Sequence, residues 1–137
     1  MEKSNKWSET KMLHKGTMKE AGLDLERMIT IRRHIHKNAE GGFKEFETSK
    51  LIYETLISFG IEEENIHKCA QTGMFVDIKG QGPPDESGQG VNCVALRADM
   101  DALPIPENNP DLEYKTQTAF AHMCGHDGHM VTLLSAT

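Results

Sequence analysis

The segment His122–His129 (HMCGHDGH) constrains the fold more than any other part of this chain, because it holds one thiol and three imidazoles within eight residues. Side chains two positions apart lie on the same side of an extended chain but on nearly opposite sides of a helix. Cys124 and His126 therefore converge only in an extended loop, whereas His126 and His129 share a face only in a helix. We predict a loop that becomes a helix near Asp127, whose charge suits the positive end of a helix dipole.

The same segment predicts a metal site. Thiolate and neutral imidazole are the ligands that zinc and similar divalent ions prefer. The alternative is a set of ordinary histidines around a small apolar cysteine, but the density of ligands favours metal binding. We predict Cys124 and His126 as ligands, with His122 and His129 as supporting residues. A catalytic zinc usually takes three protein ligands, so others have to come from elsewhere in the fold or from residues not present in this chain.

Composition narrows the class of protein. With 137 residues, 37% of them hydrophobic and 26% charged, the chain suits one small soluble domain. A formal charge of −6 argues against a nucleic-acid partner, because phosphate binding needs a basic surface. No stretch is apolar enough for a secretion signal or a membrane span, so we expect a cytoplasmic protein without a membrane partner. Cys69, Cys93 and Cys124 lack paired spacing and are expected to be free thiols, with Cys93 buried in a strand.

Two amphipathic helices are predicted after a lead-in segment, residues 1–20. In the first, apolar residues recur at helical spacing from Leu23 until the double glycine at 41–42 ends the pattern. The second lies within residues 43–60, with Gly60 as its cap. The two apolar stripes are Leu25, Met28, Ile31 and Ile35 in the first helix, and Ile52, Leu56 and Phe59 in the second.

A strand is predicted next, at residues 73–80. Met74, Val76 and Ile78 alternate there with residues that would face the other side. The following residues, 80–90, are too rich in glycine and proline for regular structure, so we predict a surface loop.

Residues 91–103 predict a second strand, apolar on both faces and therefore covered on both sides of a sheet. Its polar end carries Arg97, Asp99 and Asp101 on one side. This end is either part of a site at the sheet edge or a solvated strand end with a local ion pair. The nearby thiol and imidazoles favour a site, with Asp101 as a supporting residue. A loop of turn-forming residues, 107–120, connects it to the metal segment.

Three stretches resemble the aminoacylase and carboxypeptidase family of metal-dependent amidohydrolases: IRRHIHKNAEGGFKEFETSKLI, ALRADMDALPIPE and AHMCGHDGHMVTLL. The branch they are similar to contains hippurate hydrolases, N-acyl-amino-acid amidohydrolases and plant auxin-conjugate hydrolases. The resemblance implies an α/β fold like that of zinc peptidases, with helices packed on a mostly parallel mixed sheet and the inserted lid domain absent. It also implies one or two divalent ions, zinc or manganese with cobalt as an alternative, that activate water against the amide bond of an N-acyl amino acid or small peptide.

The resemblance also implies residue roles. Cys124 and His126 match the family's first pair of metal ligands, with the thiolate able to bridge two ions. Asp99 matches an aspartate that holds a ligand histidine in place, and we predict it as a catalytic support residue. Arg97 occupies the position of that histidine and is not assigned as a ligand.

His36 and Glu40 match the family's HxxPE element, and we predict both as supporting residues of the metal site. The chain departs from this element at two positions. It has Ala39 where the family has proline, and Gly41 where the family usually has leucine. Loss of the proline adds unfolded-state entropy, so we expect a weaker turn with unaltered ligands.

In the family, the general-base glutamate and the remaining ligands follow CGHDGH, whereas this chain ends at Thr137. We therefore expect residues 21–137 to be the N-terminal part of a catalytic metallohydrolase domain, whose full-length form could be a homodimer. The alternative is a truncated, catalytically inactive fragment that binds metal weakly or associates with a full-length relative. A small structural zinc or redox module is a third hypothesis.

Overall fold

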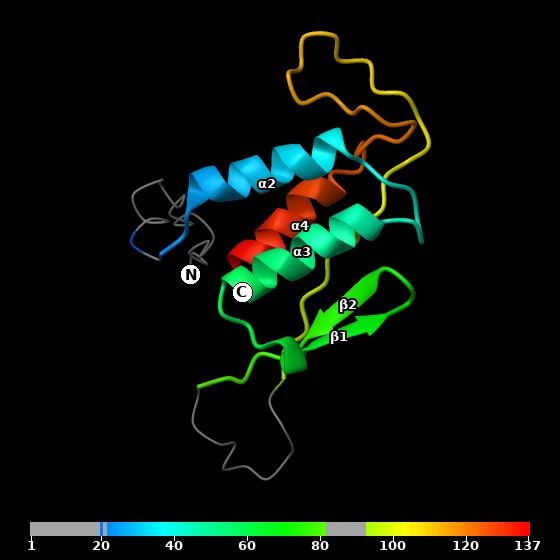
Figure 1. Ribbon diagram of the computed structural model, residues 1–137. Helices are drawn as coiled ribbons and strands as arrows, with labels where there is room; N and C mark the ends of the chain where they lie inside the picture. Colours follow the sequence, from blue (N-terminus) through cyan, green and yellow to red (C-terminus); the bar gives the residue numbers. More distant parts are fainter. Residues whose placement is uncertain (1–19, 21, 82–92) are drawn as a thin grey trace, which may run out of the picture.

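The computed structural model describes residues 20, 22–81 and 93–137 as three helices, a short 3-10 turn and one hairpin (Figure 1). The helices lie beside one another, and the hairpin follows the second of them. The elements are α2 (Leu25–Lys37), α3 (Phe46–Ser58), η1 (Glu63–Asn65), β1 (Ile66–Cys69), β2 (Gly73–Val76) and α4 (His126–Ser135).

Helix α2 confirms the first predicted helix. It begins after Asp24, whose carboxylate accepts a hydrogen bond from the backbone N–H of Arg27 at 3.0 Å. This bond satisfies one of the N–H groups that a helix start leaves without a partner. The predicted apolar stripe is buried along Met28, Ile31 and Ile35. The helix therefore presents one apolar face to the rest of the molecule.

Helices α3 and α4 also agree with prediction. In α3, Ile52 and Leu56 are buried, and Gly60 follows the helix with a φ of +88°, the left-handed conformation typical of a glycine cap. Helix α4 starts at His126, one residue before the predicted position, directly after Gly125 with a φ of +78°. Its Met130, Val131 and Leu134 are buried, and α4 packs against α2. The core consists of Met28, Ile31, Ile35, Ile52, Leu56, Ile66, Met130, Val131 and Leu134.

The hairpin only partly matches the predicted strand at 73–80. Strand β2 ends at Val76, and Ile78 is 55% exposed. Strand β2 pairs antiparallel with β1, with Ile66 opposite Val76 and Cys69 opposite Gly73. Strand β1 has no clear sequence signal, because its IHKC is short and mostly polar. The turn between the strands holds Ala70 and Gln71 at positive φ, a conformation usually marked by glycine or asparagine.

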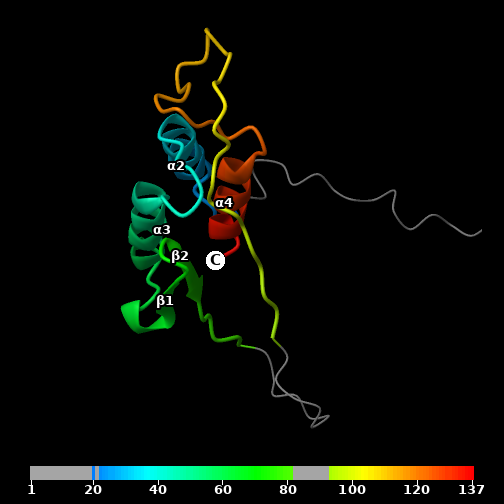
Figure 2. The ribbon, with the colours of Figure 1, turned by 90° about the vertical axis from the view of Figure 1, so that its right-hand side faces the viewer.

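The prediction of a covered strand in a mostly parallel sheet is wrong for the described residues. Residues 93–101 run as an extended segment outside any strand (Figure 2), and the sheet there is a two-stranded antiparallel hairpin. Val94 is 85% exposed and Leu96 is 64% exposed, and Cys93 is exposed rather than buried. The apolar pattern indicates that a strand at this position would need neighbouring elements on both faces. The described residues do not supply those neighbours.

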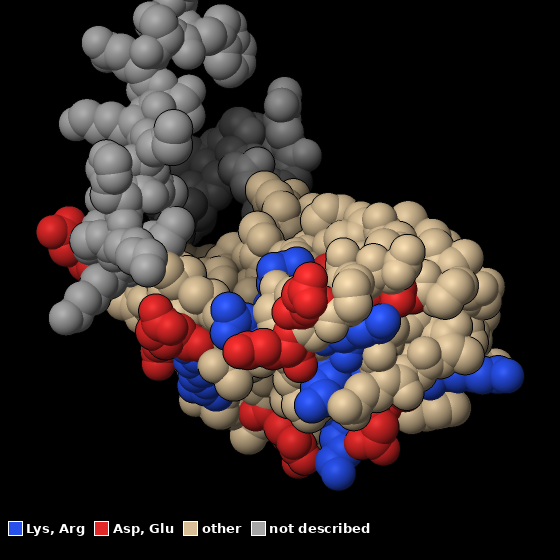
Figure 3. All heavy atoms as spheres, turned by 90° about the horizontal axis from the view of Figure 1, so that it is seen from above, with Lys and Arg blue, Asp and Glu red and all other residues tan. Residues whose placement is uncertain are grey.

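Several sequence predictions fall outside the described residues. These are the lead-in segment apart from Glu20, most of the loop at 80–90 and the start of the second strand at Val91. Within the described part of the chain, no helix is long and apolar enough to cross a membrane. Lys and Arg side chains are interleaved with Asp and Glu on the face seen from above (Figure 3).

Isolated backbone pairs tie the loops before α4 to the rest of the molecule. Gly41 forms a parallel bridge with Ala102, and Leu103 forms an antiparallel bridge with Ala121. A Cβ at position 41 would lie 2.4 Å from the Phe120 ring, so the ring occupies the space of a larger residue. These contacts hold residues 102–103 next to Gly41 and Ala121, shortly before the start of α4.

Candidate metal centre

His126 is held in one orientation at the start of α4. Its Nδ1 lies 2.8 Å from the backbone carbonyl oxygen of Asp101 and 3.2 Å from the Oδ1 of the same residue. Because a carbonyl oxygen only accepts, Nδ1 carries the proton in the 2.8 Å bond. The lone pair is then on Nε2, the arrangement usual for a metal-binding histidine whose second nitrogen donates to a carbonyl. Asp101 thus contacts His126 mainly through its backbone carbonyl, and its predicted role in supporting a metal site stays a prediction.

The other predicted residues of this segment lie around the same turn. Cys124 is exposed, and the backbone N–H of Gly125 donates to the carbonyl of His122 at 3.3 Å. His129 is exposed, with its ring centroid 5.8 Å from that of His126. The structure therefore brings the rings of His126 and His129 near each other, next to a loop that carries the thiol.

These side chains are of the types that bind divalent metals, but they are too few to complete a metal site. A thiol beside an imidazole with a free Nε2 is a suitable pair for zinc or a related ion. Within residues 20, 22–81 and 93–137, however, no group of three or more His, Cys, Asp or Glu side chains is placed to hold an ion. We call Cys124 and His126 the ligand pair.

His122 is a buried imidazole behind this loop. It is 5% exposed, and within the described residues neither ring nitrogen has a hydrogen-bond partner. Burial lowers the pKa of His122, an effect that the nearby Asp127 carboxylate opposes. Its ring centroid lies 6.3 Å from that of His36. A neutral ring at this position keeps the chemistry of a ligand, but the structure does not join it to the ligand pair.

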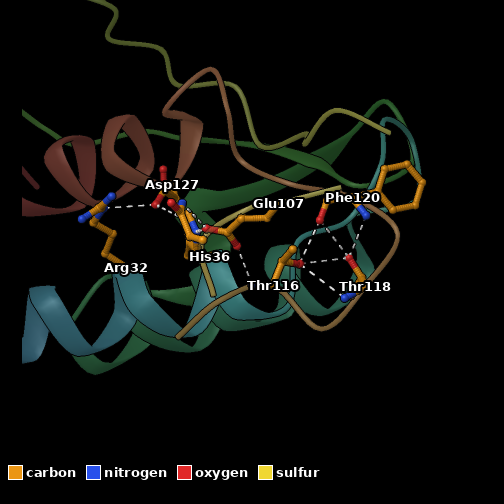
Figure 4. Close-up of polar contacts among 8 residues, drawn as sticks. Arg32, His36, Glu107, Thr116, Thr118, Phe120 and Asp127 are labelled. Atoms are coloured by element: carbon orange, nitrogen blue, oxygen red, sulfur yellow. Dashed lines mark hydrogen bonds and ion pairs between the residues drawn. The ribbon is translucent and has the colours of Figure 1, made fainter. Parts of the chain in front are cut away.

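His36 lies between two buried carboxylates (Figure 4). Its Nδ1 is 3.0 Å from Oδ2 of Asp127, and its Nε2 is 3.2 Å from Oε1 of Glu107. Carboxylates only accept hydrogen bonds, so the ring makes both bonds at once only when both nitrogens carry protons. Neither nitrogen then has a lone pair for a metal, and the geometry does not give His36 the predicted place beside the ligands.

Asp127 has a role that the sequence did not reveal. It is 1% exposed, and its Oδ2 contacts both His36 and, at 3.1 Å, the Nε of Arg32. The sequence suggested only a favourable charge in the first turn of a helix. The available signal was the spacing of Arg32 and His36, which are four residues apart and so share a face of α2. Two side chains with N–H donors on one face of a helix favour an acceptor opposite that face, and here the acceptor is the buried Asp127 carboxylate.

Glu107 is the second residue that sequence reasoning missed. It is 5% exposed and accepts hydrogen bonds from the backbone N–H of Thr116 at 2.7 Å and from Asn109 at 3.0 Å. Burial alone raises the pKa of Glu107, but the hydrogen bonds from Asn109, Thr116 and His36 outweigh it and lower the pKa to about 2. We call Arg32, His36, Glu107 and Asp127 the anchor cluster. A loop glutamate that follows two prolines gives no sequence signal for this role.

The remaining predicted support residues bind elsewhere. The Glu40 carboxylate accepts from the backbone N–H groups of Glu47 at 3.2 Å and Thr48 at 2.8 Å, and so caps the first turn of α3. Asp99 pairs with Arg97 at 2.7 Å, with both side chains largely in solvent. This is the geometry of the alternative reading, a solvated end with a local ion pair.

A cavity of about 500 Å³ lies on the side of the anchor cluster. It is bounded by Arg32 and His36 from α2, by Glu107, Asn109 and Tyr114 from the loop at 107–120, and by Met123. Met123 precedes Cys124, so the cavity and the ligand pair adjoin the same turn.

No protein-family model matches the chain, but individual proteins do. It is 45% identical over 109 residues to thermostable carboxypeptidase 2 of Saccharolobus solfataricus, covering 78% of this chain and 25% of that protein. It is 46% identical over 110 residues to IAA-amino acid hydrolase ILR1-like 2 of Arabidopsis thaliana, covering 80% of this chain and 23% of that one. It is 40% identical over 107 residues to an N-acyl-L-amino acid amidohydrolase of Geobacillus stearothermophilus, covering 78% and 26%.

Two solved structures also match this chain. A dinuclear metal binding peptidase of Bacillus subtilis, described as a member of the M20 family, matches with a TM-score of 0.66 and 35% identity, covering 80% of this chain and 28% of that one. A putative aminohydrolase of Staphylococcus aureus matches with the same TM-score and 34% identity, covering 87% and 28%. The chain spans about a quarter of the length of the curated relatives it matches, and over that quarter it is homologous to peptidases and aminoacylases of the M20 family.

Proposed function

We propose that this chain carries part of the metal site of an amidohydrolase. The observation that carries the proposal is His126, whose Nδ1 is fixed 2.8 Å from the Asp101 carbonyl, so that the ring lone pair is on Nε2, two residues after the exposed Cys124. Cys124 and His126 would hold a divalent ion, zinc or manganese with cobalt as an alternative. When bound, such an ion acidifies a water and polarises the carbonyl of the bond to be cleaved.

The proposed reaction is hydrolysis of the amide bond of an N-acyl amino acid or a small peptide. The named relatives support this substrate class, because a carboxypeptidase, an IAA-amino acid hydrolase and an N-acyl-L-amino acid amidohydrolase all act on a bond between an acyl group and an amino acid. In this chain, the Asp101 carbonyl would fix the tautomer and direction of the His126 ring. We assign no general base among the residues of this chain.

Metal binding is tested with the 137-residue chain and cobalt(II). A cobalt–thiolate bond gives an absorption band in the near ultraviolet, so titration should produce this band in the unaltered chain. Cys124→Ser should abolish it, and His126→Gln should weaken it. Cys69→Ser is the matched control, because Cys69 is also an exposed free thiol but lies in β1. A band that survives Cys124→Ser and disappears in Cys69→Ser would exclude the proposed ligand pair.

Hydrolysis is tested separately, by measuring release of the free amino acid from N-acetyl amino acids with zinc, manganese or cobalt present. Turnover that is lost in Cys124→Ser would support the amidohydrolase. Metal binding without turnover would instead support the second candidate, an inactive chain that associates with a longer family member.

One observation favours that second candidate. The segment 93–96 is extended and exposed, with Val94 85% and Leu96 64% accessible. An exposed, extended apolar segment can act as a template for another strand. Analytical ultracentrifugation of the chain, alone and with a longer relative, should reveal a complex that is lost in Leu96→Lys. A chain that sediments as a monomer in both samples would argue against this candidate.

A further inference from the structure

We propose that His36 is a positioning residue for the ligand pair: it holds Asp127, and through Asp127 it sets the direction in which α4 presents His126. This inference rests on the proposed metal site. It assigns to His36 a structural task in place of the ligand-side task predicted from sequence.

Asp127 follows His126 directly in the first turn of α4. Successive residues of an α-helix are rotated by about 100° and rise by 1.5 Å, so the two side chains leave the helix in different directions from nearly the same level. Fixing the Asp127 carboxylate therefore fixes the rotation of this turn about the helix axis. The direction of the His126 side chain is set by the same rotation.

The His36 ring joins Asp127 to a second segment of the molecule. Nδ1 contacts Asp127 at 3.0 Å, and Nε2 contacts Glu107 at 3.2 Å. Glu107 is itself bound by Thr116 and Asn109 in the loop that precedes the metal segment. A doubly protonated imidazole is a rigid spacer with donors on opposite edges. A glutamine in its place has donors on one nitrogen only and cannot reach both carboxylates in this way.

The first turn of α4 is thus held from two sides. Asp127 is bound by His36 and Arg32 of α2, and His126 is bound by the Asp101 carbonyl. Gly125, with its φ of +78°, makes the sharp entry into the helix that this arrangement needs. Loss of the His36 contact leaves Asp127 bound by Arg32 alone, so the rotation of this turn, and with it the direction of the His126 side chain, is less restricted.

If His36 positions the ligand pair, His36→Gln should lower metal affinity by more than its loss of stability explains. Removing residues that orient a ligand typically lowers metal affinity 10- to 100-fold, and we expect about a tenfold rise of the cobalt dissociation constant in His36→Gln. The matched control is Ile31→Val, which removes one methyl group from the buried face of the same helix. This control should lower the free energy of unfolding and leave the dissociation constant within about twofold.

The experiment measures three quantities on the 137-residue chain: cobalt affinity from the thiolate band, stability from urea unfolding, and the His126 ring by long-range ¹H–¹⁵N NMR without metal. The metal-free NMR signal should report a fixed Nδ1–H tautomer in the unaltered chain and in Ile31→Val, and tautomer exchange in His36→Gln. An equal loss of affinity per unit of lost stability in both variants would overturn the inference. So would an unaltered His126 spectrum and an unaltered affinity in His36→Gln.

Two further arms keep the outcome decisive. If His36→Gln does not fold, Glu107→Gln removes the charge on the far side of the ring, and a smaller change of the same kind in the His126 spectrum is then expected. An unaltered spectrum in that variant contradicts the inference. If the unaltered chain binds no cobalt, the proposed metal site fails, whereas the metal-free NMR comparison still decides whether His36 positions His126.

Discussion

His126 and Asp127 are adjacent in sequence, yet they lie in opposite environments. Asp127 is 1% exposed and shares one oxygen between His36 and Arg32. The His126 side chain is 20% exposed and is held through one ring nitrogen, next to an exposed thiol. In the anchor cluster the carboxylates are buried and bonded to His36, although Arg32 is 45% exposed, whereas the thiol of Cys124 is exposed. Within one run of ligand-type residues, a side chain that stabilises the fold can thus stand next to one that offers a donor atom.

The largest effect should come from breaking the anchor cluster. Asp127→Asn removes the buried carboxylate that Arg32 and His36 share, and we expect a loss of about 3–5 kcal/mol in the free energy of unfolding. Urea unfolding followed by circular dichroism measures it. Asp99→Asn is the matched control, because the Asp99–Arg97 pair is largely in solvent and should contribute less than about 1 kcal/mol. Equal losses in the two variants would remove the distinction between buried and exposed carboxylates.

A second expected effect is acid sensitivity from Glu107. Its pKa is lowered from 4.5 to about 2, so the folded chain binds this proton less readily than the unfolded chain does. The contribution of Glu107 is therefore complete above about pH 4.5 and is lost as the pH falls towards 2. Unfolding measured between pH 6 and pH 2.5 should show a fall in stability that is smaller in Glu107→Gln. An identical pH profile in that variant would assign acid sensitivity to other groups.

A smaller effect is expected at the contact between Gly41 and Phe120, outside both regions. In Gly41→Ala the new Cβ would lie 2.4 Å from the Phe120 ring, which has to shift, at a cost of about 1 kcal/mol. Gly42→Ala is the matched control, because its Cβ would have an ordinary 3.9 Å contact with Asp101. Thermal unfolding of both variants gives the difference. If Gly42→Ala is the more damaging change, the contact with Phe120 is not what selects glycine at position 41.

The smallest effect should come from the open region. Cys124→Ser and His129→Gln alter exposed side chains, so each should change the free energy of unfolding by less than about 0.5 kcal/mol without metal. Cys124→Ser should nevertheless abolish the cobalt–thiolate band. If Cys124→Ser unfolds the metal-free chain, the thiol is part of the core, and the contrast with Asp127 disappears.

The helices were predictable because their signals are local. The stripe from Met28 to Ile35, the cap at Gly60 and the loop-to-helix change near His126 all depend on neighbours within a few residues. The same local reasoning placed Cys124 in a loop beside the start of a helix, and the contact of His126 with Asp101 lies next to it; the ligand roles of Cys124 and His126 stay predictions.

The rest depended on distant partners. Glu107 and Asp127 are 71 and 91 residues from His36, and nothing in their own neighbourhoods predicts that pairing. The apolar run at 91–96 was read as a covered strand, because the pattern specifies what burial requires and not whether neighbouring strands are present. Strand β1 was missed because its turn uses Ala70 and Gln71 at positive φ in place of glycine or asparagine.

The 91-residue separation of His36 and Asp127 also has a consequence for synthesis. A ribosome adds about 5–20 residues per second, so the nascent chain carries His36 for roughly 5–20 s before Asp127 is made. During that interval the inner face of α2 has neither its carboxylate nor the apolar side chains of α4 that later cover it. The face of α2 that packs against α4 therefore stays without this cover until the residues of α4 have been made.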